Sequence, residues 1–161
     1  WGLIDSTGKF ILKQAFDTYS NFSNDFIKLR QGNKYGLFDL QTHQVLPCQY
    51  TSITPTGLHR FLLEQNGRFG VYEPRKGIHL PCDYEAIGFT DEEKGWIRVQ
   101  QNGKWGWVDK KGKVMIPIRY DAIAPFEDGK APVIQLPYED HFFINYQGEF
   151  LLESLRKREE E

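Results

Sequence analysis

The sequence predicts an all-β protein made of short antiparallel repeats, and three observations support this prediction. Weaker copies of Gln101–Pro117, QNGKWGWVDKKGKVMIP, recur about every 35 residues along the 161-residue chain. Dipeptides that favour two-residue hairpin turns stand in the copies, at Gly32-Asn33, Asn66-Gly67 and Asn102-Gly103. Helical periodicity is absent before residue 153. We expect β-meander or hairpin units stacked as an open superhelix, with a small five-bladed β-propeller as the alternative.

The hairpin at Asn102-Gly103 sets the expected strand register. Counting back from this turn pairs Gln101 with Lys104 and, at the far end, Ile97 with Val108. One face then carries only apolar residues and glycine, namely Ile97, Val99, Gly106 and Val108. The other face mixes large rings with polar groups, namely Trp105, Trp107, Arg98 and Gln100. A hairpin with apolar groups on both faces must be covered on both, as happens when units stack.

An aromatic residue followed by glycine marks the start of each unit. The pairs are Trp1-Gly2, Tyr35-Gly36, Phe69-Gly70 and Trp105-Gly106. Glycine has no side chain, so a neighbouring backbone or ring can come close to it. We expect the rings to supply buried area between units, and a ligand platform built from the aromatic column is the functional alternative.

The units follow in order along one array that covers residues 1–152. We expect units at 1–34, 35–68, 69–104 and 105–140, a partial unit at 141–152, and a polar tail at 153–161. The third unit contains an acidic insertion, Asp91–Gly95, and the fourth lengthens after Gln135. Loss of the motif in the last unit is typical of a capping repeat.

Two further columns repeat with the units. Prolines recur at Pro47, Pro81 and Pro117, and we expect them at sheet edges because proline lacks a backbone donor. Three residues after each proline stands a tyrosine, and a phenylalanine takes this place in the first unit: Tyr50, Tyr84, Tyr120 and Phe16. We expect these rings to insert between units.

The charge and amino-acid composition of the chain limit the classes of partner that it could bind. The net charge is −2 and the isoelectric point is near 6.1, so no basic field favours nucleic acid. No apolar run approaches the roughly 18 residues that a membrane span needs. The chain reads as soluble, and its compartment is not readable because a removed leader would leave no trace.

Several segments together resemble one bacterial repeat family. The segments WGLID, YGLFD, FGVYE and KWGWVDKKGKVMIPIRYDAI are similar to WG repeats, also described by a Lys-Trp-Gly motif, across residues 1–152. The resemblance implies an interaction module, a bacterial cytoplasmic or envelope protein, and no catalytic residues to transfer. Tyr35, Phe69 and His141-Phe142 depart from the motif.

Possible metal and thiol chemistry has simpler structural explanations. One carboxylate recurs per unit, at Asp5, Asp39, Glu73 and Asp109, and calcium would need several such ligands at one place. We expect turn caps there, except at Glu73, and no metal or cofactor. Cys48 and Cys82 could form a disulfide or share a metal with His43 or His79, but we expect two small residues filling equivalent slots. No arrangement of nucleophile and base indicates an enzyme.

We therefore expect a non-enzymatic module that binds a protein or peptide on a curved β surface. The candidate binding residues are Trp96, Arg98, Gln100 and Trp107 on the mixed face, Asp91 and Glu92 in the insertion, and Tyr138. Recognition of glycans or the cell envelope by exposed aromatic rings is the alternative. Peptide addition to an open sheet edge is a further possibility.

Overall fold

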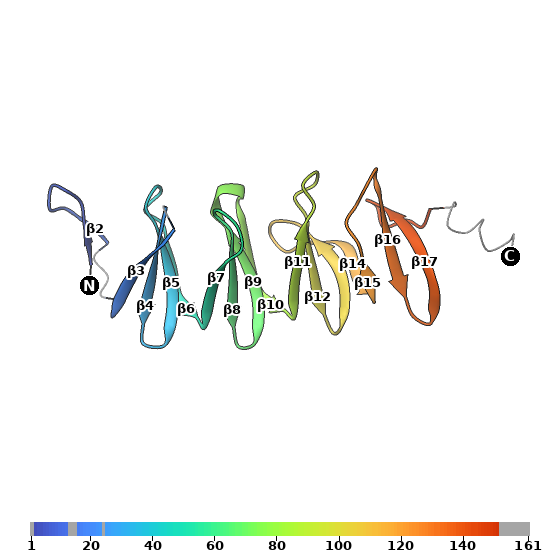
Figure 1. Cartoon of the computed structure of the whole chain (residues 1–161), viewed down its shortest axis with the longest axis horizontal. Helices are drawn as coiled ribbons and strands as arrows, with labels where there is room; N and C mark the ends of the chain where they lie inside the picture. The colour runs from blue at the N-terminus through green and yellow to red at the C-terminus, as the bar shows by residue number, and fades with distance from the viewer. Residues whose placement is uncertain (1, 13–15, 24, 152–161) are drawn as a thin grey trace, which may run out of the picture.

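The computed structural model describes residues 2–12, 16–23 and 25–151, so Trp1 and the expected polar tail lie outside the described residues. Within these ranges five antiparallel sheets follow one another along the chain (Figure 1). The first sheet holds β1 (Leu3–Ile4) and β2 (Phe10–Leu12). The second holds β3 (Thr18–Ser23), β4 (Phe26–Gln31), β5 (Lys34–Asp39) and β6 (Val45–Tyr50).

The remaining three sheets continue the same pattern. The third holds β7 (Ser52–Pro55), β8 (Phe61–Gln65), β9 (Arg68–Glu73) and β10 (Ile78–Tyr84), with a 3-10 turn at Pro74–Lys76. The fourth holds β11 (Ala86–Thr90), β12 (Ile97–Gln101), β13 (Lys104–Val108) and β14 (Val114–Tyr120). The fifth holds β15 (Ala122–Ile123), β16 (Lys130–Gln135) and β17 (Tyr138–Asn145).

Each sheet is an up-and-down meander, because strand order in the sheet follows strand order in the sequence. The sheets lie in a row and do not close on themselves, so the all-β open array is confirmed and the propeller alternative is not (Figure 1). Tight hairpin turns line one edge of the row, and the longer loops line the other (Figure 1).

The hairpin register expected from Asn102-Gly103 is confirmed. Gln101 pairs with Lys104, and Ile97 pairs with Val108. Asn102 and Gly103 have φ values of 52° and 74°, the two positive angles that a type I′ turn requires. The same count holds for the hairpins of β4–β5 and β8–β9.

The sheets are displaced by half a repeat from the sequence units. The aromatic-glycine pair opens the third strand of each complete sheet, not the first, because it lies in β5, β9 and β13. Each sequence unit therefore supplies two strands to one sheet and two to the next. A single residue joins consecutive sheets from the second onward, namely Thr51, Glu85 and Asp121.

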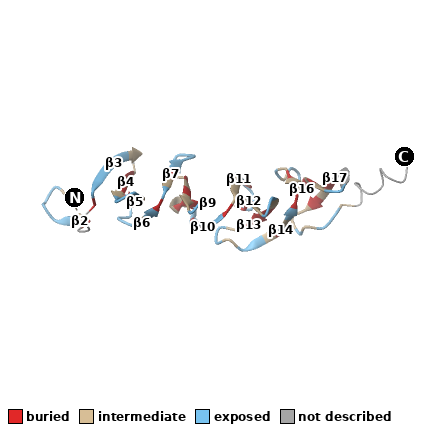
Figure 2. Ribbon diagram, turned by 90° about the horizontal axis from the view of Figure 1, so that it is seen from below, coloured by how far each residue is buried: buried red, intermediate tan, exposed pale blue. Residues whose placement is uncertain are grey.

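Each interior sheet buries one face against the sheet before it and the other face against the sheet after it. The first strand of a sheet contacts the third strand of the sheet before it, as β11 contacts β9. We call the face toward the preceding sheet the backward face and the opposite face the forward face. Ile97, Val99 and Val108 pack backward on the third sheet, while Trp107 packs forward on the fifth. Buried residues accordingly lie mainly in the strands, and exposed residues lie at the turns and along edge strands such as β3 (Figure 2).

The glycine of the aromatic-glycine pair makes room for backbone. A Cβ built on Gly106 would lie 2.6 Å from the carbonyl oxygen of Ile116, and one on Gly70 would lie 2.3 Å from that of Leu80. The fourth strand passes over the glycine at this point, where the register between third and fourth strands shifts. A side chain here would collide with backbone, which cannot rotate away as a side chain can.

The proline and tyrosine columns also lie where they were expected. Pro47, Pro81 and Pro117 fall in β6, β10 and β14, which are edge strands of their sheets. The rings that follow them are all buried between sheets, at Phe16, Tyr50, Tyr84 and Tyr120.

Candidate functional site

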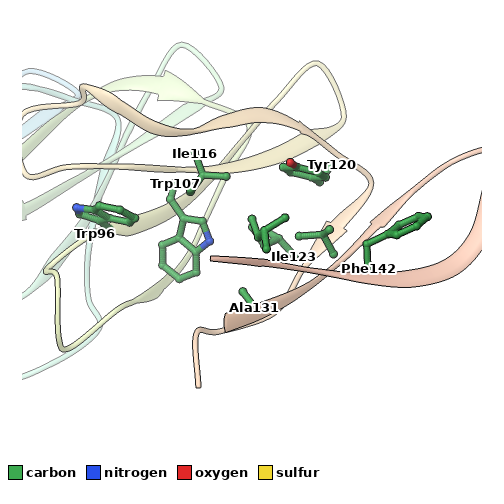
Figure 3. Packing of buried hydrophobic residues seen from close by; sticks show 9 residues of the cluster. Trp96, Trp107, Ile116, Tyr120, Ile123, Ala131 and Phe142 are labelled. Carbon is green, nitrogen blue, oxygen red and sulfur yellow. The ribbon is translucent and has the colours of Figure 1, made fainter. Parts of the chain in front are cut away.

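The mixed face predicted as a binding surface lies between the fourth and fifth sheets. Trp107 is 0% exposed and Trp96 is 9% exposed, and both belong to the buried cluster that joins these sheets (Figure 3). The ring of Trp96 meets the edge of Phe126 at 6.3 Å and of Tyr146 at 5.5 Å between centroids. The two tryptophans therefore hold the array together and leave no free ring face for a partner.

The predicted acidic insertion is partly structural. Asp91 is buried, accepts a hydrogen bond from the Lys94 backbone N–H at 2.7 Å, and accepts another from the Tyr146 hydroxyl at 3.2 Å. Glu92 beside it has 84% of its side chain exposed. Gln100 is half-buried in β12, and the Tyr138 side chain lies outside the described part of the structure.

A groove of about 620 Å³ opens between the third and fourth sheets. We call it the Arg60 groove. Its lining includes the apolar Leu62 and Val71 on the forward face of the third sheet, and Phe89 on β11. Arg60, Glu92 and Arg98 line it as well, so two of the predicted binding residues meet here. Val71 is 1% exposed and Phe89 is 53% exposed, so the groove combines a buried apolar base with an accessible ring.

Both arginines of the groove are fixed around one strand. Arg60 donates to the Thr90 hydroxyl at 2.7 Å and makes a long contact of 3.5 Å with the Gly88 carbonyl oxygen. Arg98 lies against Gly88, where an added Cβ would be 2.3 Å from its Nε, and donates to the Ile123 carbonyl oxygen at 2.8 Å. Glycine at position 88 is therefore what admits the Arg98 side chain.

Aromatic rings also surround the guanidinium of Arg98. Its central carbon lies 4.3 Å from the centroid of Phe89 and 4.6 Å from that of Trp105. Burial lowers the pKa of Arg98, because desolvation disfavours the charged form. Neither Arg98 nor Arg60 forms an ion pair with a carboxylate of the described residues.

A second hollow, of about 430 Å³, shares Arg60 and Glu92 with the groove and extends along the loop edge. Its other cations are paired. Arg75 holds Asp39 through two hydrogen bonds of 2.5 and 3.0 Å, and Lys76 lies 3.5 Å from Glu73. The Arg75 guanidinium lowers the pKa of Asp39 to about 2, since it hydrogen-bonds to the ionised form.

The repeated carboxylates cap turns, as the sequence predicted. Asp5 accepts from the Thr7 backbone N–H at 2.8 Å, and Asp109 accepts from that of Lys111 at 2.9 Å. The turn after Glu73 is instead a 3-10 turn in which Glu73 makes no side-chain cap. Among the described residues, no group of three or more histidines, cysteines or carboxylates is placed to hold a metal ion.

Sequence reasoning missed a second set of carboxylate caps at the opposite edge. Asp17, Glu85 and Asp121 stand where one sheet passes to the next, and each accepts from a backbone N–H in the hairpin turn of the following sheet. The donors are Gly32 at 2.6 Å, Asn102 at 2.6 Å and Leu136 at 2.7 Å. The signal was present, because each of these carboxylates directly follows a buried ring of the tyrosine column.

Cys48 and Cys82 are both free thiols in the structure. Cys48 packs on the cluster between the first and second sheets, and Cys82 packs on the next cluster along the row. Burial raises the pKa of Cys82 to about 11, so its thiol stays protonated at neutral pH. Ile118 takes the same place in the fourth sheet and packs on its cluster, which fits a slot for a small or medium apolar side chain.

Comparisons with known proteins agree with the repeat architecture. The family model described as "WG containing repeat" matches residues 1–35, 76–105 and 105–135. Residues 36–75 lie between these matches and form strands of the same kind. No curated protein matches the chain. Within the described ranges, no helix is long and apolar enough to cross a membrane. Because the matched segments cover more than half of the 161 residues, the chain belongs to the WG-repeat family.

Proposed function

We propose that this chain is a non-enzymatic repeat module that binds a protein or peptide partner in the Arg60 groove. The observation that supports this proposal is the groove itself, in which the half-buried Leu62 stands beside the buried Val71. The equivalent positions on the fourth sheet are Arg98 and Trp107, and the Trp107 ring fills the space before the fifth sheet. The cross-strand pair of the fourth sheet is thus covered by the next sheet, whereas that of the third sheet borders a groove beside the buried cluster that joins the third and fourth sheets.

The groove has the composition of a peptide site. Its volume of about 620 Å³ lies within the range of known ligand pockets, roughly 300–1,000 Å³. Exposed aromatic rings and arginines are the residues that most often dominate binding energy at protein interfaces. The charged side chains of its lining are Arg60, Arg98 and Glu92, and arginine does not act as a proton carrier near neutral pH. This set favours binding over proton-transfer chemistry.

Recognition of glycans, the alternative function, has less support. Sugar stacking needs an exposed ring face, and Trp96 and Trp107 are buried while Trp105 is partly buried beneath Arg98. The aromatic residues that are clearly exposed in the described ranges are Phe10, Tyr19, Phe89 and Phe150, which do not form one platform along the row. Binding on a glycan array that Phe89→Ser abolished would restore this alternative.

A selection from a random twelve-residue peptide library on phage tests the proposed function. The full chain serves as bait, and enriched peptides are measured against Phe89→Ser and against Val114→Ser. Phe89 is 53% exposed in the groove, whereas Val114 is 50% exposed on an edge strand elsewhere, so each variant removes an apolar side chain that is about half exposed. We expect at least a tenfold loss of affinity with Phe89→Ser only. Equal binding to both variants, or no enrichment over an empty support, contradicts the proposal.

A further inference from the structure

We propose that the Arg60 groove selects acidic peptides, with carboxylates of the partner pairing with Arg60 and Arg98. This inference rests on the proposed function and adds the chemical class of the partner. It follows from the charges that remain unpaired in the groove, from the way both guanidiniums are held, and from the apolar base beside them.

The groove and the neighbouring hollow contain more positive charge than their own carboxylates neutralise. Arg75 is paired with Asp39, and Lys76 lies 3.5 Å from Glu73 and 3.9 Å from Glu92. Arg60 and Arg98 instead donate only to neutral oxygens, a hydroxyl and backbone carbonyls. Two unneutralised guanidiniums in one groove, on a chain of net charge −2, form a local field that attracts an anionic partner.

The charge on Arg98 is partly desolvated without a compensating anion. Its Nε atom is buried and has no hydrogen-bond partner within the protein. Burial also lowers the pKa of this guanidinium, which means that its surroundings oppose the charged form. A carboxylate that reaches the outer nitrogens of this guanidinium would offset part of the lost hydration, since hydrogen bonds between arginine and carboxylates are strong.

The two guanidiniums are already ordered before a ligand arrives. Arg60 is anchored on the Thr90 hydroxyl, and Arg98 is stacked between the rings of Phe89 and Trp105. Binding therefore does not have to immobilise two flexible cations, a cost that often reduces the affinity of surface ion pairs. Anchoring favours a defined spacing of carboxylates along the peptide over diffuse attraction.

The rest of the lining narrows the partner further. Leu62 and Phe89 offer apolar contact next to the arginines, which suits a peptide that has aliphatic or aromatic residues beside its acidic ones. Glu92 lines the same groove with its side chain 84% exposed, so the lining has two positive charges against one negative and favours a peptide with few carboxylates over a densely charged polyanion. The site therefore fits an acidic, partly apolar peptide.

To test this inference, peptide pools are selected on three baits and then sequenced. The baits are the unmodified chain, the double variant Arg60→Gln/Arg98→Gln, and the control Lys111→Gln/Lys113→Gln. The control removes the same number of positive charges from exposed lysines of another loop. We expect aspartate and glutamate beside apolar residues to be enriched at least fivefold on the unmodified chain and on the control. We expect the double variant to bind the selected peptides at least tenfold more weakly, and replacement of the peptide carboxylates by amides to have the same effect.

Each other outcome overturns a specific statement. If the selected peptides are neutral or basic, depend on Phe89, and bind the double variant as tightly as the unmodified chain, acidic selection is refuted and the proposed function stays intact. Peptides that bind regardless of Phe89 and of both arginines would refute both. Thermal unfolding is followed for every bait, and if Arg98→Gln lowers the melting temperature, Arg60→Gln alone is used, with a threefold loss of affinity expected. An unchanged affinity in that single variant would contradict the inference.

Discussion

The forward faces of the third and fourth sheets are equivalent in the repeat, but they differ in how their central residues are covered. The central cross-strand pair is Leu62 with Val71 in the third sheet and Arg98 with Trp107 in the fourth. The larger pair closes its junction, because Trp107 is fully buried against the fifth sheet. The smaller pair leaves the Arg60 groove open. Both junctions contain a buried core, and the third–fourth junction differs in that a groove borders its smaller pair.

The largest effect is expected from truncating the two equivalent side chains, Trp107 and Val71. Trp107→Ala should lower the free energy of unfolding by about 4 kcal/mol, since a buried ring leaves a large cavity. Val71→Ala should cost only about 2 kcal/mol, because it removes two methyl groups beside an existing groove. Urea denaturation of both variants measures the difference. Equal costs would show that the two junctions are not packed differently.

The glycines under the fourth strand should respond alike in both sheets. Gly70→Ala and Gly106→Ala should each cost about 3 kcal/mol, because the new Cβ would meet backbone atoms at 2.3 and 2.6 Å. Gly57→Ala is the control, since its Cβ would meet the nearest atom at an ordinary 3.5 Å. We expect a change within about 0.5 kcal/mol for this control in the same denaturation assay. A tolerated alanine at Gly106 would contradict the role assigned to the motif glycine.

Acid should act differently on two otherwise equivalent caps, Asp39 and Asp109. The pKa of Asp39 is lowered to about 2 by Arg75 of the following sheet, so its ionised form stabilises the fold above about pH 4. That contribution, about 2 kcal/mol, is lost as the pH falls from 4 toward 2. Asp39→Asn should therefore destabilise the chain at pH 7 and have little effect at pH 2.

Asp109 provides the matched comparison for this acid effect. Asp109 caps the equivalent turn of the fourth sheet, and among the described residues it forms no ion pair to the next sheet. Asn145 caps the equivalent turn of the fifth sheet with its amide oxygen. Asp109→Asn should therefore change stability by less than about 0.5 kcal/mol at pH 7. Stability curves from urea titrations at pH 7, 4 and 2 test both variants. A loss of similar size at both positions would show that the ion pair contributes nothing beyond the turn cap.

A small effect on stability, but a large one on binding, is expected when Leu62 of the third sheet is replaced by arginine, the residue at the equivalent place in the fourth sheet. Leu62→Arg places a long side chain across the base of the Arg60 groove, where its stem can pack on apolar surface. The melting temperature should change by no more than a few degrees, and affinity for selected peptides should fall at least tenfold. Leu136→Arg, at an exposed hairpin turn elsewhere, is the control. Undiminished peptide binding would place the site outside the groove.

Local rules predicted the architecture well. Asn102-Gly103 set the register of a hairpin, alternation then identified one apolar and one mixed face, and stacking was predicted because both faces carried apolar groups. The repeated carboxylates were recognised as caps because Asp5 and Asp109 act within their own turns. These features depend on neighbours close in the sequence.

The binding surface could not be predicted in the same way, because it depends on contacts between sheets. Trp107 and Arg98 alternate onto one mixed face, but sequence alone does not show that another sheet covers it. The groove borders Leu62 and Val71, and the sequence distinguishes these apolar residues from others only when their counterparts in the next sheet are compared. Arg60 was missed because its partners, Gly88 and Thr90, lie about 30 residues away.

The half-repeat offset between sequence unit and sheet affects how such arrays can change in length. A unit that begins at an aromatic-glycine pair supplies the last two strands of one sheet and the first two of the next. Duplication or deletion of one whole unit therefore leaves every interior sheet with its full set of strands. Gene duplication or deletion can then change the number of units without producing a sheet that lacks strands. Each added junction between sheets is a further place where a groove can evolve.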